Sequence, residues 1–185
     1  WHGIIRALFS IDFRSKRNMA ENSPANGAAN PAAEANQAQL NLQKIYTKDI
    51  SFEVPNAPNV FQLQGQPAVE LNLSQRVNTL AESVYEVVLS VTVTCKIEEN
   101  TAYLAEVHQA GIFGVAGFDA ASQEAVLATY CPNVLFPYVR QIVSDLVQGG
   151  GFPPLFLQPI NFDAIFAEQQ RRRVEAPTQS PTLNS

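Results

Sequence analysis

Nucleophiles, bases and metal ligands are sparse in this 185-residue sequence, and their spacing favours no catalytic centre. Cys95 and Cys131 lie 36 residues apart, and the only histidines are His2 and His108. Residues this far apart do not form the closely spaced Cys and His pairs that are typical of zinc sites. So few thiols are compatible with a reducing compartment. We therefore expect no metal site built from Cys and His.

Phosphate-binding and hydrolase motifs are also missing. The glycines of AGIFGVAG (110–117) are spaced three apart, unlike a dinucleotide-binding loop, and Gly149–Gly151 is not followed by the Lys-Ser/Thr of a phosphate-binding loop. No GxSxG nucleophile elbow occurs. His108 has the chemistry of a general base, but its position on the polar face of a predicted strand is more typical of a surface histidine. We predict that the protein is not an enzyme.

The composition describes an acidic chain with enough apolar residues for a packed core. Hydrophobic residues make up 46% and charged residues 16%, and 12 Lys+Arg face 17 Asp+Glu, for a net charge of -5. The local excess of basic residues lies within the first 18 positions. This distribution argues against a nucleic-acid-binding surface. No run of about 18 apolar residues occurs, so we predict no insertion into a membrane.

Residues 1–18, WHGIIRALFSIDFRSKRN, precede Met19, the only methionine of the chain. The composition changes at that point, and we interpret these residues as a translated leader or an artefact. A secretory signal is the alternative, but Arg6 and Asp12 interrupt the apolar stretch 3–13, and no small-residue cleavage site follows it.

Two further segments lack the apolar side chains that a core requires. Residues 19–39 are rich in Ala, Asn and Pro, and residues 174–185 contain prolines and small polar residues. We expect both segments to be disordered. The folded domain is then predicted to span residues 40–173.

Four stretches of this domain have the alternating pattern of β-strands: Ile45–Val54, Val69–Ser74, Tyr85–Ile97 and Tyr103–His108. In the first stretch the pattern places Tyr46, Ile50 and Phe52 on one face and Thr47, Asp49, Ser51 and Glu53 on the other. The polar run 98–100 predicts a tight turn, so the third and fourth strands should be antiparallel.

Helical patterns follow the strands. One helix is compatible with Ala121–Tyr130, and Cys131–Pro132–Asn133 is expected to interrupt it before a second helix over Leu135–Val147, with Pro137 in its first turn. Gly149–Gly151 should end that helix. A last helix is predicted behind an Asn161 N-cap and ends in three arginines. Strands followed by helices indicate the α+β class, with a four-stranded antiparallel sheet and C-terminal helices.

Two surface features suggest binding rather than catalysis. The acidic face of the first strand is either a solvated strand face or a docking surface for a cationic partner, and Leu104 beside Glu106 favours the second interpretation. The segment FPPLFLQP (152–159) is unusually apolar for a loop. Core packing and oligomer burial account for most such residues, and the remainder is compatible with an apolar groove for extended chains.

Several long blocks of the sequence resemble one family. They are IYTKDISFEVPNAPNVF (45–61), VYEVVLSVTVT (84–94), AGIFGVAGF (110–118) and YCPNVLFPYVRQIVSDLVQGGGFPPLFLQPINFDAIF (130–166). In this order they are similar to SecB, the bacterial protein-export chaperone family, over about residues 40–173. The resemblance implies a homotetramer, built as a dimer of dimers, without catalysis or cofactor. It also implies a cytoplasmic protein that binds unfolded precursor proteins and delivers them to the SecA ATPase.

The resemblance also assigns roles to residues. By position, the SecA-docking surface falls on Asp49, Ser51, Glu53, Leu104 and Glu106. The positions tied to oligomer assembly are Tyr103, Ala105, Val107 and Gln109. The client-binding positions are Val69, Leu71, Leu73, Phe162, Ile165 and Phe166. Gly65 stands where an aromatic residue is expected near the client groove. The alternative from another class is a non-enzymatic oligomeric adaptor that binds one folded partner.

Overall fold

A computed structural model of the chain describes residues 7–14 and 38–175. The elements, in chain order, are β1 (Ala7–Arg14), β2 (Gln39–Glu53), the short 3-10 helix η1 (Asn59–Gln62), β3 (Pro67–Ala81), β4 (Val84–Ile97), β5 (Asn100–Ala116), α1 (Ala120–Ala128), α2 (Tyr130–Gly149) and α3 (Phe162–Glu175). The predictions for most of the leader, the N-terminal low-complexity segment and the end of the tail lie outside the described residues.

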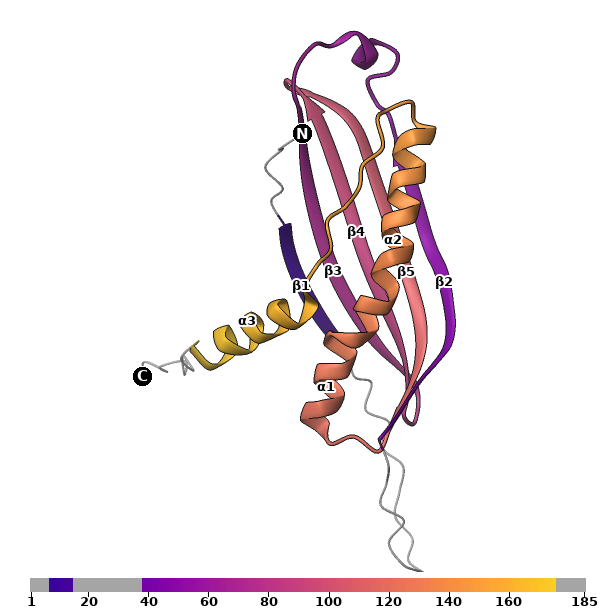
Figure 1. Cartoon of the computed structure of the whole chain (residues 1–185), viewed down its shortest axis with the longest axis vertical. Coiled ribbons are helices and arrows are strands. Elements are labelled where there is room, and N and C mark those ends of the chain that lie inside the picture. Colours follow the sequence, from indigo (N-terminus) through magenta and orange to yellow (C-terminus); the bar gives the residue numbers. More distant parts are fainter. Residues whose placement is uncertain (1–6, 15–37, 176–185) are drawn as a thin grey trace, which may run out of the picture.

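The strands form one sheet in the order β1-β3-β4-β5-β2 (Figure 1). Strands β3, β4, β5 and β2 are antiparallel neighbours, which confirms the predicted four-stranded antiparallel sheet. The predicted turn between the third and fourth strands is also confirmed, since β4 ends at Ile97 and β5 begins at Asn100. Glu98 takes a positive φ of 57° there. The strands are longer than their sequence patterns, and β5 continues through the glycines of 110–117.

A fifth strand was not expected. Residues Ala7–Arg14, which belong to the segment interpreted as a leader, form β1 and pair in parallel with β3. The pairing runs without a shift from Ala7 opposite Leu71 to Arg14 opposite Asn78. Strand β1 therefore takes the edge that β3 would otherwise present in the four-stranded sheet.

Among the described residues, the helices lie against one face of the sheet. Helix α2 packs along β5 and β4, and the segment 150–161 then crosses the same face toward α3 (Figure 1). Side chains on this covered face alternate with those on the open face, as in β5, where Tyr103, Ala105 and Val107 are buried while Leu104 and Glu106 are half-buried. The hydrophobic core therefore lies between the sheet and α2.

Two details of the first predicted strand differ in the structure. Register shifts interrupt the pairing of β2 with β5 between Leu42 and Lys44 and between Thr47 and Asp49. The second shift inserts Lys48 as an extra residue, so the alternation on its two sides is out of phase. As a result Tyr46 bonds to Glu86 on the open face, whereas Thr47 bonds to Gln109 on the covered face. The predicted faces of Tyr46 and Thr47 were wrong for this reason.

The helix boundaries also need correction. Helix α1 is capped by Asp119, whose carboxylate accepts hydrogen bonds from the backbone N–H groups of Ala121 and Ser122. The interruption between α1 and α2 falls at Thr129 rather than at 131–133, because a proline at 132 is compatible with the first turn of α2. Pro137 therefore lies inside α2 and not in its first turn.

The ends of the later helices agree with the sequence pattern. Helix α2 ends at Gly149 in the expected glycine run, and Gly151 has a positive φ of 85°. The side chain of Asn161 accepts a hydrogen bond of 2.9 Å from the N–H of Ala164, which confirms it as the cap of α3. Arg173 of α3 forms an ion pair with Glu124 of α1, so α3 is held beside α1.

Candidate functional site

The acidic residues predicted for docking gather on the open face of the sheet. In the register of β2 with β5, Asp49 lies opposite His108, Ser51 opposite Glu106, and Glu53 opposite Leu104. All five predicted residues, Asp49, Ser51, Glu53, Leu104 and Glu106, therefore occupy neighbouring positions on two adjacent strands. We call these five residues the acidic patch. In this arrangement Glu53 lies directly opposite the half-buried Leu104, Glu106 is two residues along the same strand, and Asp49 lies further away at the His108 end of the patch.

His108 belongs to the same neighbourhood. Its Nε2 lies 2.8 Å from Oε1 of Glu106, and the side chains are 32% and 42% exposed. His108 also lines a cavity of about 470 Å³ with Asp49, Ser74 and Ser90. The four residues are opposite one another on β2, β5, β4 and β3, so they form one polar row across the sheet. His108 is thus a partner of the acidic patch rather than an isolated surface histidine.

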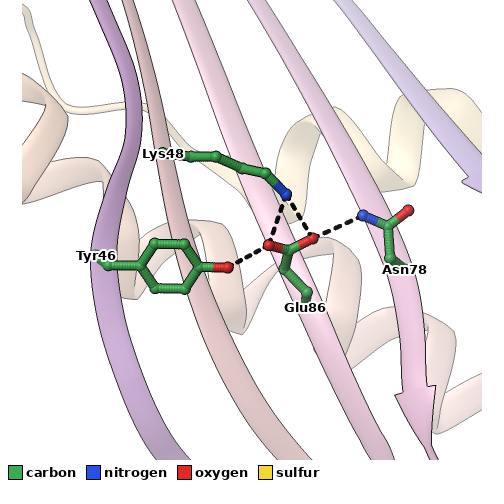
Figure 2. A network of polar contacts seen from close by, with 4 residues as sticks. All are labelled: Tyr46, Lys48, Asn78 and Glu86. Carbon is green, nitrogen blue, oxygen red and sulfur yellow. Dashed lines mark hydrogen bonds and ion pairs between the residues drawn. The ribbon is translucent and has the colours of Figure 1, made fainter.

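A buried carboxylate lies further along the open face (Figure 2). Glu86 of β4 is 5% exposed and accepts hydrogen bonds from Lys48 at 2.8 and 2.9 Å and from Asn78 at 2.8 Å. The hydroxyl of Tyr46 is a further donor. These partners come from β2 and β3, so the contacts tie together three strands of the sheet. We call these four residues the Glu86 network.

The Glu86 network holds an ionised acid. Burial alone would raise the pKa of Glu86, but the hydrogen bonds from Lys48, Tyr46 and Asn78 outweigh it, so the pKa is lowered. Burial, together with the hydrogen bond to Glu86 and its negative charge, raises the pKa of Tyr46 to about 12. Because Lys48 is the inserted residue of the β2 bulge and precedes Asp49, the network also fixes where the acidic patch begins.

The predicted client-binding residues divide into two groups. Leu71, Leu73 and Phe162 are 6%, 3% and 1% exposed and belong to the core. The remaining three, Val69, Ile165 and Phe166, are only partly buried. The structure therefore makes the second group accessible to a ligand, whereas the first group supports the fold.

Sequence reasoning missed an aromatic cluster at one end of the sheet. Ring centroids are 6.0 Å apart for Phe52 and Tyr103, 4.9 Å for Tyr103 and Phe152, and 5.2 Å for Phe152 and Phe61. Phe61 is 52% exposed. The four rings come from β2, β5, η1 and the segment that follows α2, which meet at the same end of the sheet. The apolar character of 152–159 was a signal for the last of these, but no sequence spacing joins it to Phe61.

Gly65 lies beside the same end of the sheet. A Cβ at this position would come within 2.8 Å of Cγ of Glu98 and 3.0 Å of Cγ2 of Ile97. A side chain at position 65 would therefore have to displace residues of the β4–β5 turn. The glycine at the position where an aromatic residue was expected is explained by this close packing.

Clefts lined by both apolar and polar residues lie between α2 and β2. One, of about 470 Å³, is lined by Ile45, Thr47, Gln109, Tyr138 and Ile142 together with Tyr46 and Gln141. A second, of about 360 Å³, includes Phe52 and Leu146. Tyr138 and Ile50 are 48% and 44% exposed beside these clefts. Beside these clefts, Tyr138, Ile142 and Leu146 form an apolar strip along α2 that the described part of the chain leaves at least partly exposed.

Known proteins match this arrangement. The family model for preprotein translocase subunit SecB matches residues 33–173. A protein-export protein SecB of Stenotrophomonas maltophilia is 57% identical over 150 residues, which cover 81% of this chain and 87% of that protein. A protein-export protein SecB of Xylella fastidiosa is 51% identical over 160 residues, with coverage of 86% and 93%. This chain belongs to the SecB family.

A solved structure supports the fold. A SecB-like chaperone of Mycobacterium tuberculosis, in complex with an antitoxin peptide, has a TM-score of 0.56 and 21% identity, covering 66% of this chain and 91% of that one. The SecB-like α+β fold is therefore confirmed. Within residues 7–14 and 38–175, no helix is long and apolar enough to cross a membrane. The same described residues contain no group of three or more His, Cys, Asp or Glu that would hold a metal ion.

The four positions that the SecB resemblance ties to assembly are buried within the subunit. Tyr103, Ala105, Val107 and Gln109 are at most 4% exposed. They lie on the covered face of β5, beneath α2. In this subunit they support α2, so an effect on assembly would be transmitted through the position of that helix.

The Glu86 network should make the stability of the fold depend on pH. Because the pKa of Glu86 is lowered in the folded state, its charge stabilises the fold above the unfolded pKa of about 4.3, and this contribution is lost as pH falls through the folded pKa. Glu86→Gln should lower the free energy of unfolding at pH 7 by about 1–3 kcal/mol. Urea unfolding should also depend less on pH between 7 and 3 in this variant. Glu70→Gln, an exposed change on the same face, is the control. Equal pH slopes in wild type and Glu86→Gln would contradict the prediction.

Proposed function

We propose that this SecB family member binds unfolded precursor proteins in the cytosol, keeps them competent for translocation and delivers them to SecA. The observation that carries this proposal is the division of the sheet into two faces. Accessible apolar and aromatic groups accompany the covered face, whereas the acidic patch lies on the open face. A chain bound at the first surface leaves the second free for a partner, as delivery requires.

Client binding is assigned to side chains that remain accessible. These are Phe61 of the aromatic cluster together with Val69, Ile165 and Phe166. Full burial of one such side chain contributes roughly 1.5–3 kcal/mol, and several weak contacts along one extended chain reinforce each other. Apolar contacts of this kind do not require a particular client sequence. They therefore suit precursors that share only the unfolded state.

Docking of SecA is assigned to the acidic patch. Its carboxylates attract a cationic module at long range, and Leu104 offers a small apolar anchor among them. Repetition of the patch in an oligomer adds avidity. Exposed charges are screened over about 8 Å at physiological ionic strength, so this contact should weaken with salt whereas client binding should not.

The alternative function is an oligomeric adaptor for one folded partner. The acidic patch fits either function, but partly exposed aromatic side chains such as Phe61 favour a chaperone, because they contact apolar groups of any sequence. The two functions differ in what they bind. An adaptor ignores denatured proteins of unrelated sequence, whereas a chaperone captures them. Capture of reduced, carbamidomethylated lysozyme, a permanently unfolded protein, tests this distinction by size-exclusion chromatography with light scattering.

The proposed client surface can be tested by substitution. Replacing Phe61 and Phe166 together by serine should weaken capture of the unfolded lysozyme by about tenfold or more, since 1.4 kcal/mol of lost contact corresponds to a factor of ten. The loss should be similar at low and high salt. Leu80→Ser, which changes an exposed apolar residue at the far end of β3, is the matched control. Unaltered capture by a folded double variant would remove these two residues from the site.

The proposed docking of SecA at the acidic patch can be tested in the same way. Asp49→Asn with Glu106→Gln should reduce SecA affinity severalfold at low salt, and the difference should shrink as salt is added. Capture of unfolded lysozyme and the oligomer mass should stay normal. Glu70→Gln removes a carboxylate from the same face on β3 and serves as the control. Unchanged SecA affinity at low salt, or an equal loss of client capture, would refute the separation of the two surfaces.

The oligomeric state can also be tested by substitution. We propose a homotetramer, arranged as a dimer of dimers, in which the apolar strip along α2 is covered by other subunits. Tyr138→Glu with Ile142→Glu should yield smaller species in light scattering while the circular dichroism stays native. Val107→Glu should instead destabilise the subunit, because Val107 is 0% exposed in the core. A wild-type protein that is monomeric at micromolar concentration would contradict the tetramer.

A further inference from the structure

We propose that β1 is an intramolecular competitor of the client, and that the edge of β3 is the position for which the two compete. This inference rests on the proposed chaperone function. It assigns a regulatory role to the segment Ala7–Arg14, which occupies in cis a site for extended chains. An unfolded client that pairs with the same edge must displace β1.

The sheet order shows which edge is involved. Without β1, β3 would be an edge strand with a row of unpaired backbone N–H and C=O groups. Such an edge accepts an added strand through main-chain hydrogen bonds, which require no particular sequence. Strand β1 uses this mode of binding, because it pairs with β3 over eight consecutive residues, from Ala7 opposite Leu71 to Arg14 opposite Asn78.

The sequence of β1 has the alternating pattern of an ordinary strand-forming segment. Its residues alternate between apolar and polar, with Phe9, Ile11 and Phe13 at every second position. In the register these three positions are opposite Leu73, Gln75 and Val77. Alternation of this kind is common in chains that form strands when they fold, so many clients contain comparable segments.

The occupied edge adjoins the client-binding surface. Strand β3 begins at Pro67, four residues before the register with β1 starts at Leu71. Val69, one of the accessible client-binding candidates, lies in this uncovered part of β3. A client bound at Val69 that continues along the same strand therefore meets β1. The competition follows from this continuity.

Competition by β1 should change the apparent affinity for a client by an amount that can be measured. The apparent dissociation constant of a client increases in inverse proportion to the fraction of molecules in which the edge is free. If β1 occupies the edge for nine-tenths of the time, freeing it should raise the apparent affinity about tenfold. The test therefore compares full-length chains in which β1 is released or locked in place.

Two consecutive prolines release β1. Successive backbone N–H groups of a strand alternate in direction, so Ile11→Pro with Asp12→Pro removes at least one N–H that faces β3. This variant should bind reduced, carbamidomethylated lysozyme more tightly than wild type. Ala20→Pro, a single proline outside β1, is the control and should change nothing.

A reversible disulfide locks β1. Ser10 lies opposite Ser74 in the register, and adjacent strands are about 4.8 Å apart, which a disulfide spans. Oxidised Ser10→Cys with Ser74→Cys should bind the unfolded lysozyme more weakly than wild type, and reduction should restore the affinity. Ser10→Cys with Ser90→Cys is the matched control, because β4 lies one strand further away. The native Cys95 and Cys131 are buried.

Hydrogen exchange of the β3 backbone reports the competition directly. Within residues 71–78, the alternate amides that point toward β1 rather than β4 should be protected in wild type, exchange faster in the proline variant, and regain protection when the unfolded lysozyme is added. Equal affinity in the released, locked and wild-type chains, or β3 protection that neither the prolines nor the client changes, would overturn the inference while leaving the proposed chaperone function intact. If no variant and no wild type captures lysozyme, the proposed function itself fails, and the inference fails with it.

Discussion

The structure depends on one constraint, which is that a single layer of helices covers one face of a wide sheet. The covered face can bury valines, leucines and aromatic residues, as in β4, where Val87, Leu89 and Val91 are 0% exposed. The open face carries mainly polar residues at the alternate positions of β4, such as Glu86, Ser90 and Thr92, with Val88 as an apolar exception. Two surfaces with different chemistry arise from the same strands without any additional domain. The separation that we propose between client capture and partner docking follows from the alternation of side chains along a strand.

The open face must still keep its strands in register, although it lacks a hydrophobic layer to do so. The Glu86 network helps to keep the strands of the open face in register, because Glu86 of β4 is held by residues of β2 and β3 (Figure 2). Removing one partner would leave a buried charge without compensation, which is far more costly than losing an exposed ion pair. The network also stabilises the bulge at Lys48. The bulge brings Lys48 and Asp49 to the same face, so a structural contact determines the position of a carboxylate that we propose for docking.

Sequence patterns predicted the elements whose periodicity is uninterrupted. Strands β4 and β5, the turn at 98–100 and the Asn161 cap were all found in this way. The bulge at Lys48 was not, because an inserted residue changes the phase of the pattern without a signature of its own. The aromatic cluster was missed because Phe61 and Phe152 are 91 positions apart and meet only through tertiary contacts. Burial also divides the predicted client residues, since a strand pattern shows which face Leu71 occupies but not what covers that face.

Strand β5 connects the two functions physically. Tyr103 joins the aromatic cluster on the covered face, and the next residue, Leu104, belongs to the acidic patch on the open face. A register slip of one residue would exchange these two environments, so any change in strand pairing would damage both surfaces together. The central strands are therefore expected to keep their pairing during the proposed delivery of a client. Changes at the sheet edges and in the loops above the aromatic cluster would alter the proposed client surface while the acidic patch keeps its geometry.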